Sequence, residues 1–188
     1  MVEGSGSTRN SAADDPGYLR SITSKTVLGQ FRLIMVAILL VPIAVIGLVP
    51  LVAGVGASPV LYVVLPPLLA ISGFVMARML VLRSAPPLPV RLPHGEDHGA
   101  TAVAALRQAT YLPLALTEAP LLIGFMLSVV AGSTLPYLAG FVVGWPLMVV
   151  ASLPTHTRIE RIRASLESQG ATSHLWDVLL SAPRSYVH

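Results

Sequence analysis

The chain has no cysteine and few charged residues, with 12 basic and 9 acidic side chains among 188 residues. Without cysteine it cannot form disulfides, thiolate metal sites or cysteine nucleophiles, and it cannot be palmitoylated. Charged residues make up 11% of the sequence and hydrophobic residues 54%, whereas about a quarter of a typical soluble domain is charged. This composition predicts a protein embedded in lipid.

Long uncharged stretches indicate the fold class. No charged residue occurs between positions 33 and 77, and Glu118 is the only one between positions 108 and 155. Each stretch is long enough to cross a bilayer twice at about 20 residues per span. We therefore expect an all-α integral membrane protein whose four transmembrane helices form two hairpins, at residues 27–53, 60–82, 110–131 and 135–153.

More polar segments flank and interrupt the expected transmembrane domain, residues 23–153. Residues 1–22 are rich in Gly and Ser and predict a disordered tail. A proline-rich connection, residues 83–107, joins the two hairpins, and its second half has a helical periodicity that predicts a short interfacial helix. An amphipathic tail follows at residues 154–188.

The basic residues predict the topology. All twelve lie in the tails, in the middle connection or at helix ends next to them, and the two short turns have none. By the positive-inside rule, we expect a multi-pass protein of the cell (cytoplasmic) membrane with both termini and the middle connection in the cytoplasm. Arg32, at the start of the first apolar segment, is expected to snorkel to the lipid headgroups.

The C-terminal tail has two short apolar faces. Ile159, Ile162 and Leu166 share one face of an expected helix, and Trp176 and Leu179 lie in a second helix expected at residues 173–181. Such faces predict contact with the membrane surface, with a partner protein or with the bundle itself.

Glu118 is the principal candidate site residue, because ionisable side chains near the bilayer midplane are costly and often mark function. Thr117 precedes it, and Pro120 cannot donate a backbone hydrogen bond to the carbonyl of Leu116. Arg78, near the end of the second segment, is a candidate ion-pair partner about 6–7 Å away along the helix axes. The alternatives are a structural carboxyl group, a proton or cation site, and a contact with another subunit or a lipid headgroup.

A local resemblance to a known family surrounds this carboxyl group. The run LALTEAPLLIGF from Leu114 to Phe125, preceded by Arg107-Gln108, is similar to the carboxylate-bearing helix of subunit c of rotary ATP synthases. The resemblance implies that Glu118 would bind and release a transported proton. The chain departs from that family in the segment before, where only Gly73 stands in place of a glycine repeat, and in its long middle connection. The resemblance therefore does not extend to a rotary ring.

Small residues at a spacing of four predict close helix packing. Gly140 and Gly144 form such a pair in the fourth segment, and Gly124 with Ser128 forms a weaker one in the third. The expected contact lies either inside the four-helix bundle or between chains.

No catalytic or phosphate-binding motif is present, and no basic and aromatic stripe indicates nucleic acid binding. His94 and His98 lack a third ligand nearby, so we expect neither a metal nor a cofactor. The chain is thus expected to be a non-catalytic accessory or scaffold subunit of a larger membrane complex, of transport or respiratory type, with other membrane subunits as partners. The alternative is a proton- or ion-translocating subunit that uses Glu118, acting as a homo-oligomer. A lipid-modifying enzyme is the weakest of the three hypotheses.

Overall fold

The computed structural model describes residues 17–81, Leu88 and residues 98–182. In these ranges helices dominate, and the prediction of four helices long and apolar enough to cross a membrane is confirmed. In chain order the helices are α1 (Tyr18–Ile22), α2 (Val27–Ala53), α3 (Val60–Val81), α4 (His98–Ala131), α5 (Leu135–Ser152), α6 (His156–Leu166) and α7 (Leu175–Leu180).

Helix α4 is longer than expected. It begins at His98 and has 34 residues, so the second half of the predicted connection at 83–107 belongs to the same helix as the third apolar segment. No glycine or proline occurs between Ala100 and Leu112 to interrupt the helix. At 1.5 Å per residue α4 is about 51 Å long, well beyond the roughly 30 Å of a bilayer core.

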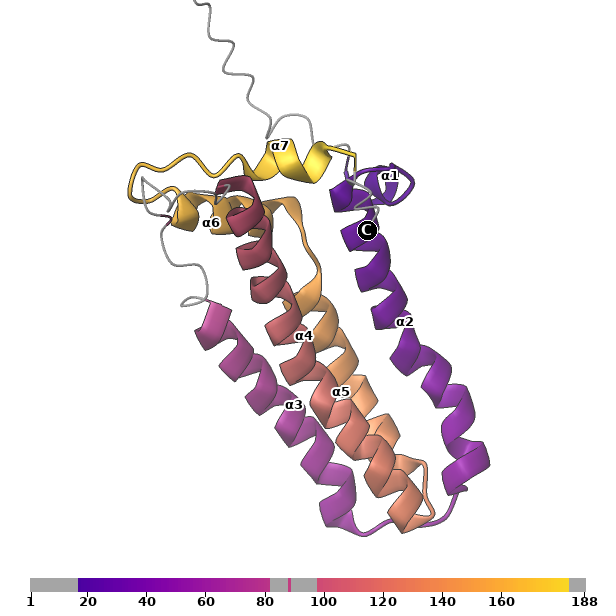
Figure 1. The fold of residues 1–188 in the computed structure, drawn as a ribbon. Coiled ribbons are helices and arrows are strands. Elements are labelled where there is room, and N and C mark those ends of the chain that lie inside the picture. The colour runs from indigo at the N-terminus through magenta and orange to yellow at the C-terminus, as the bar shows by residue number, and fades with distance from the viewer. Residues whose placement is uncertain (1–16, 82–87, 89–97, 183–188) are drawn as a thin grey trace, which may run out of the picture.

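The two ends of the bundle differ. Helices α1, α6 and α7 lie together at one end, which we call the capped end, and the turns at residues 54–59 and 132–134 lie at the other, the turn end (Figure 1). A buried core at the capped end is formed by the first half of α4, the start of α2, and the inner faces of α6 and α7. The projecting part of α4 is thus covered by the C-terminal segment.

Helices α3, α4 and α5 pack closely on one another, and α2 packs more sparsely on α4 and α5 (Figure 1). Two side chains of α5 attach α2. The Tyr137 hydroxyl donates to the Pro42 carbonyl at 2.7 Å, and Trp145 Nε1 donates to the Leu39 carbonyl at 2.9 Å. The aromatic rings of Tyr137, Phe141 and Trp145 continue along this contact.

The turn end explains why α2 and α3 lie apart. The Thr134 hydroxyl donates to the Gly54 carbonyl at 2.5 Å, and the Gly56 amide donates to the Gly132 carbonyl at 3.3 Å. The turn at residues 54–59 therefore contacts the turn at residues 132–134. Helices α4 and α5 lie between α2 and α3 (Figure 1). Helices α2 and α3 follow each other in the chain, as the first expected hairpin requires. They nevertheless pack mainly on α4 and α5 and not on each other.

Candidate functional site

Glu118 lies on α4 and is half-buried. No other described residue forms a hydrogen bond or ion pair with its carboxyl group. Thr117, next to it, is fully buried, and its hydroxyl donates to the carbonyls of Pro113 and Leu114 at 2.8 and 3.1 Å. Thr117 therefore stabilises its own helix and makes no bond with the Glu118 carboxyl group.

The carbonyl of Leu116 lies where the sequence predicts an acceptor without its helical donor. Pro120 is buried inside α4 and supplies no N–H to it. Gly73 of α3 approaches so closely that an added Cβ would lie 2.4 Å from the Leu116 oxygen. Close backbone approach of α3 thus covers this carbonyl, and Glu118 does not donate to it.

Arg78 is exposed near the end of α3, at the capped end of the bundle. Its guanidinium lies over the ring of Phe74, with 5.4 Å between Cζ and the ring centroid. No ion pair between Arg78 and Glu118 occurs among the described residues. The structure brings Arg78 together with two arginines of α6.

These arginines surround a cavity of about 430 Å³ where α3, α4, α5 and α6 meet. Its cationic lining comes from Arg78, Arg158 and Arg161. Hydroxyl groups and apolar side chains complete it, and no acidic residue is among the described residues that line it. The further lining residues are Ala77, Pro113, Val150, Ala151, Leu153, Thr155, Thr157, Ile162 and Ser165.

Arg158 is held in place by backbone acceptors. One of its terminal nitrogens donates to the carbonyl of Ala151 near the end of α5, and the other donates to the carbonyl of Ala109 at 2.7 Å. Burial, followed by the nearby positive charge of Arg78, lowers the pKa of the Arg158 guanidinium below its ordinary value. The cavity thus gathers like charges that the described acidic residues do not balance.

The arginine cavity was missed in the sequence, where Arg158 and Arg161 only marked the polar side of an amphipathic helix. A signal was present in principle. Three arginines follow within nine residues of Pro154, just after the fourth apolar segment, and Arg78 ends the second segment at the same side of the membrane. That α6 folds back to meet the end of α3 could not be predicted from their spacing.

The apolar faces of α6 and α7 are not available to a partner or to the membrane surface. Ile159, Ile162, Leu166, Trp176 and Leu179 are each no more than 5% exposed. They pack on the capped-end core with α2 and α4. Of the three contacts that the sequence allowed, the structure forms the one with the bundle itself, because α4 projects far enough to offer an apolar surface.

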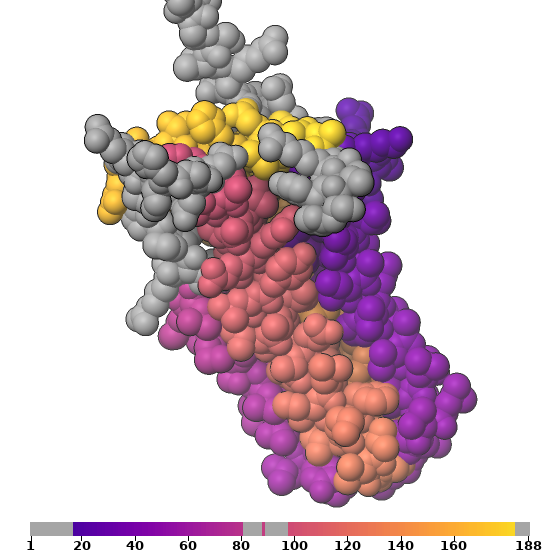
Figure 2. Space-filling model, in the orientation of Figure 1, coloured from indigo at the N-terminus to yellow at the C-terminus, as the bar shows by residue number. Residues whose placement is uncertain are grey.

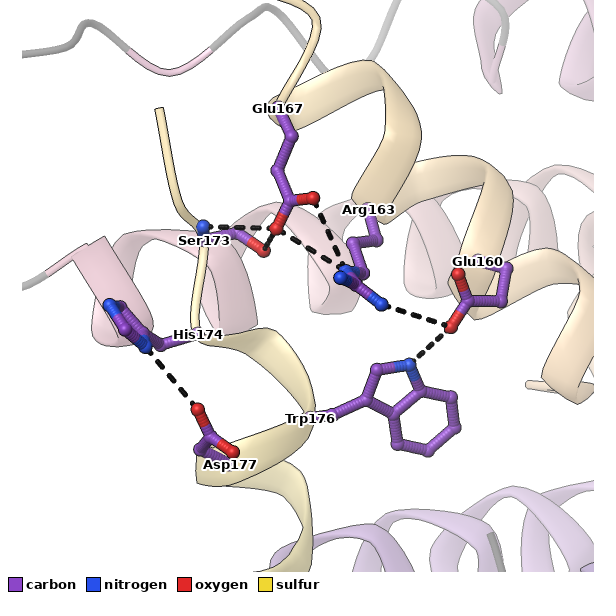
Figure 3. A network of polar contacts seen from close by, with 7 residues as sticks. All are labelled: Glu160, Arg163, Glu167, Ser173, His174, Trp176 and Asp177. Carbon is purple, nitrogen blue, oxygen red and sulfur yellow. Dashed lines mark hydrogen bonds and ion pairs between the residues drawn. The ribbon is translucent and has the colours of Figure 1, made fainter. Parts of the chain in front are cut away.

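Polar contacts fasten this cap (Figure 3). The indole of Trp176 donates to the carboxylate of Glu160, which lies 3.6 Å from Arg163. Arg163 also pairs with Glu167 at 3.3 Å, and the Ser173 hydroxyl and amide donate to Glu167 at 2.7 and 3.1 Å. The acidic residues of α6 and its C-cap are thereby engaged with Arg163 and α7.

The small residues of the predicted packing motifs lie inside the bundle. Gly140 faces Pro66, Gly144 faces Leu121 and Ala70, and Gly124 faces Pro136 and Pro66. The Ser128 hydroxyl accepts the Tyr137 amide at 2.9 Å. These contacts hold α3, α4 and α5 together within one chain.

No group of three His, Asp or Glu residues in the described ranges could hold a metal ion. Of the histidine pair singled out in the sequence, His98 starts α4 and His94 lies outside the described residues. Comparison with protein-family models, curated proteins and solved structures finds nothing that matches this chain.

Proposed function

We propose that this protein is a non-catalytic accessory or scaffold subunit of a larger complex in the cytoplasmic membrane, of transport or respiratory type. The observation that supports this proposal best is Glu118, a half-buried carboxyl group without a bonding partner among the described residues. Glu118 lies roughly 20 Å from Ala131 along α4, which corresponds to the middle of a bilayer.

A carboxyl group at that depth needs protein or water around it. Ionisable side chains in membranes almost always face a bundle interior or a water-filled cavity. Glu118 lines neither the arginine cavity nor a smaller cavity between α2 and α4. A transmembrane helix of another subunit, carrying a hydrogen-bonding side chain, would supply the missing partner.

The surface around Glu118 suits such a helix. Tyr111, Ala115, Leu122 and Met126 are exposed and follow helical spacing on either side of Glu118. Leu122 is 59% exposed and Met126 61%. Helix α4 is visible on the front of the molecule between α3 and α2 (Figure 2). An exposed apolar stripe with a single carboxyl group at its centre is typical of a helix that forms a hydrogen bond with a second helix in lipid.

The proposed orientation places the capped end in the cytoplasm. The described basic residues gather at that end, and the turns at 54–59 and 132–134 have none. The positive-inside rule then puts both termini and the middle connection in the cytoplasm, with the two turns outside. Little of the chain is left on the outer side to bind a soluble ligand.

The test is native extraction of the wild type and of two Glu118 variants in a mild detergent, followed by mass measurement and identification of companions. The wild type should travel in a discrete hetero-complex. Glu118→Gln, which keeps a hydrogen-bonding side chain, should retain that complex. Glu118→Leu should weaken it about three- to eighteenfold, as expected from about 0.6–1.7 kcal/mol for a hydrogen bond between membrane helices. A complex of unchanged stability in Glu118→Leu would contradict the proposal.

A second candidate function uses the same carboxyl group. If Glu118 carries a proton or cation, the companion would be a second copy of this chain, and a lone homo-oligomer would replace the hetero-complex. Glu118→Gln would then abolish transport by reconstituted protein while leaving the oligomer intact, because the amide cannot ionise. The extraction experiment and the transport experiment therefore distinguish a structural role of Glu118 from an ion-carrying one.

A further inference from the structure

We propose that the arginine cavity between α3, α4, α5 and α6 binds the phosphate headgroup of an anionic phospholipid. Arg78, Arg158 and Arg161 line it from two helices. Guanidinium groups bind phosphate oxygens through charge-assisted, bidentate hydrogen bonds. Basic pockets between membrane helices at the cytoplasmic side are suited to acidic lipid headgroups.

The charges of the cavity call for an anion. The described acids of this region pair elsewhere: Glu160 and Glu167 contact Arg163, and Glu167 also accepts two hydrogen bonds from Ser173. The guanidinium of Arg158 receives partial compensation from the carbonyls of Ala151 and Ala109. A phosphate would offset the repulsion between the guanidinium groups of Arg78 and Arg158, which line the same cavity.

Hydroxyl and backbone donors add to the site. Thr155 is the N-cap of α6, and Thr157 lies in its first turn. Both residues line the cavity together with Ser165. The first turn of a helix presents N–H groups without helical partners, and these favour phosphate oxygens.

The apolar half of the cavity points to a lipid as the source of that phosphate. Ala77, Val150 and Leu153 line the cavity together with the arginines. Exposed apolar side chains continue along the bundle toward the bilayer, with Val75 and Met79 on α3 and Val150 on α5. Acyl chains can lie on this surface while the headgroup stays among the arginines, and a free phosphate would leave the apolar wall unused.

The experiment uses the full-length protein, purified in detergent and stripped of lipid. Native mass spectrometry then measures binding of phosphatidylglycerol, phosphatidylcholine and inorganic phosphate. We expect phosphatidylglycerol to bind at least tenfold more tightly than phosphatidylcholine, and inorganic phosphate at millimolar concentration not to displace it. Equal binding of the two lipids would overturn the proposal. Displacement by inorganic phosphate would overturn the lipid as the source of the anion.

Two arginines are suitable for substitution, because Arg158 also bonds the carbonyls of Ala151 and Ala109. Arg78→Gln and Arg161→Gln should each weaken phosphatidylglycerol binding about fivefold, which is the usual contribution of one basic residue near an anionic membrane. Arg20→Gln, an exposed arginine of α1, makes the same charge change outside the cavity and should leave binding unchanged.

Arg161→Lys retains the charge without the planar fork and should bind between the wild type and Arg161→Gln. For each variant, the helical circular dichroism signal and the elution volume in size-exclusion chromatography are compared with the wild type to check folding. Equal loss of binding in Arg20→Gln and in the cavity variants would show a diffuse charge effect and would overturn the site.

Discussion

At the scale of single residues, Arg32 shows how a charge at the membrane boundary is accommodated by the chain itself. It is only 1% exposed, and its guanidinium donates to the Ser21 hydroxyl at 2.6 Å and to the Gly17 carbonyl at 3.3 Å. The guanidinium also lies over the ring of Tyr18. The expectation that Arg32 snorkels to lipid headgroups is wrong, because α1 folds over it. A five-residue helix is unstable alone, and these contacts explain its presence.

Glu167 makes the capped end sensitive to acid. Burial raises the pKa of its carboxyl group, but hydrogen bonds from Ser173 and then from Arg163 outweigh burial, and the pKa falls below its ordinary value of 4.5. A carboxylate with a lowered folded-state pKa stabilises the fold above the unfolded value and loses that contribution as the pH falls through the folded value. The contact between α6 and α7 should therefore loosen below about pH 4.5.

This prediction can be checked by the fluorescence of Trp176 or by hydrogen exchange of the Ser173 amide between pH 7 and pH 3. Glu167→Gln should remove the acid step, since an amide does not ionise in this range. Asp177→Asn, at an exposed carboxylate that pairs with His174, should keep it. An identical acid step in the wild type and Glu167→Gln would count against the assignment.

At the scale of helices, glycine and proline determine how α3, α4 and α5 meet. Membrane helices gain no hydrophobic energy from association in lipid, so they depend on close packing. Gly73 lies against the Leu116 carbonyl, and Gly140 lies against Pro66. The prolines that interrupt hydrogen bonding within a helix thus face the glycines that allow another helix to approach.

Gly140→Ala should destabilise this three-helix unit by about 1–3 kcal/mol, the usual cost of overpacking. An added Cβ would lie 2.8 Å from the Cβ of Pro66, and neither group can yield without moving a helix. Gly47→Ala on α2 is the matched control, since its added Cβ meets nothing within 4 Å. Unfolding in mixed detergent and dodecyl sulfate micelles measures the difference, and equal stability of the two variants would refute the packing argument.

At the scale of the whole molecule, the fold divides into a bundle of four long apolar helices and a cap at one end of it. Exposed apolar side chains occur along all four long helices, where lipid is the expected neighbour. The capped-end core is closed by residues from the start of α2, the middle connection and the C-terminal segment. Leu88 donates its amide to the Leu166 carbonyl at 2.9 Å, and Val27 donates to the Ser181 carbonyl at 3.1 Å. The first and last described helices, α1 and α7, therefore lie at the same end of the bundle.

The absence of cysteine makes this topology directly testable. In Ala57→Cys and Ser181→Cys, one thiol is introduced at the exposed turn end and one after α7. A membrane-impermeant maleimide should label Ala57→Cys on intact cells and Ser181→Cys only after the membrane is opened. The cysteine-free wild type provides the background. Labelling of both variants on intact cells would contradict a capped end in the cytoplasm.

The amino-acid sequence by itself determined the four long helices and all of their boundaries except the start of α4. The predicted segments at 27–53, 60–82 and 135–153 end within one residue of α2, α3 and α5. Apolar length alone specifies these elements, because a backbone in hydrocarbon must satisfy its hydrogen bonds within a helix.

Only the tertiary structure decided which helices are neighbours and where the arginines meet. An apolar helix face in the sequence predicts apolar surroundings. It does not show whether lipid, a partner protein or the same chain supplies them. Ile159 and Trp176 illustrate this, since both turn inward onto α4. The cavity joins Arg78 to Arg158 across a large separation in sequence. That juxtaposition arises because the first turn crosses the second and α6 folds back over the bundle, geometry that no local pattern of residues encodes.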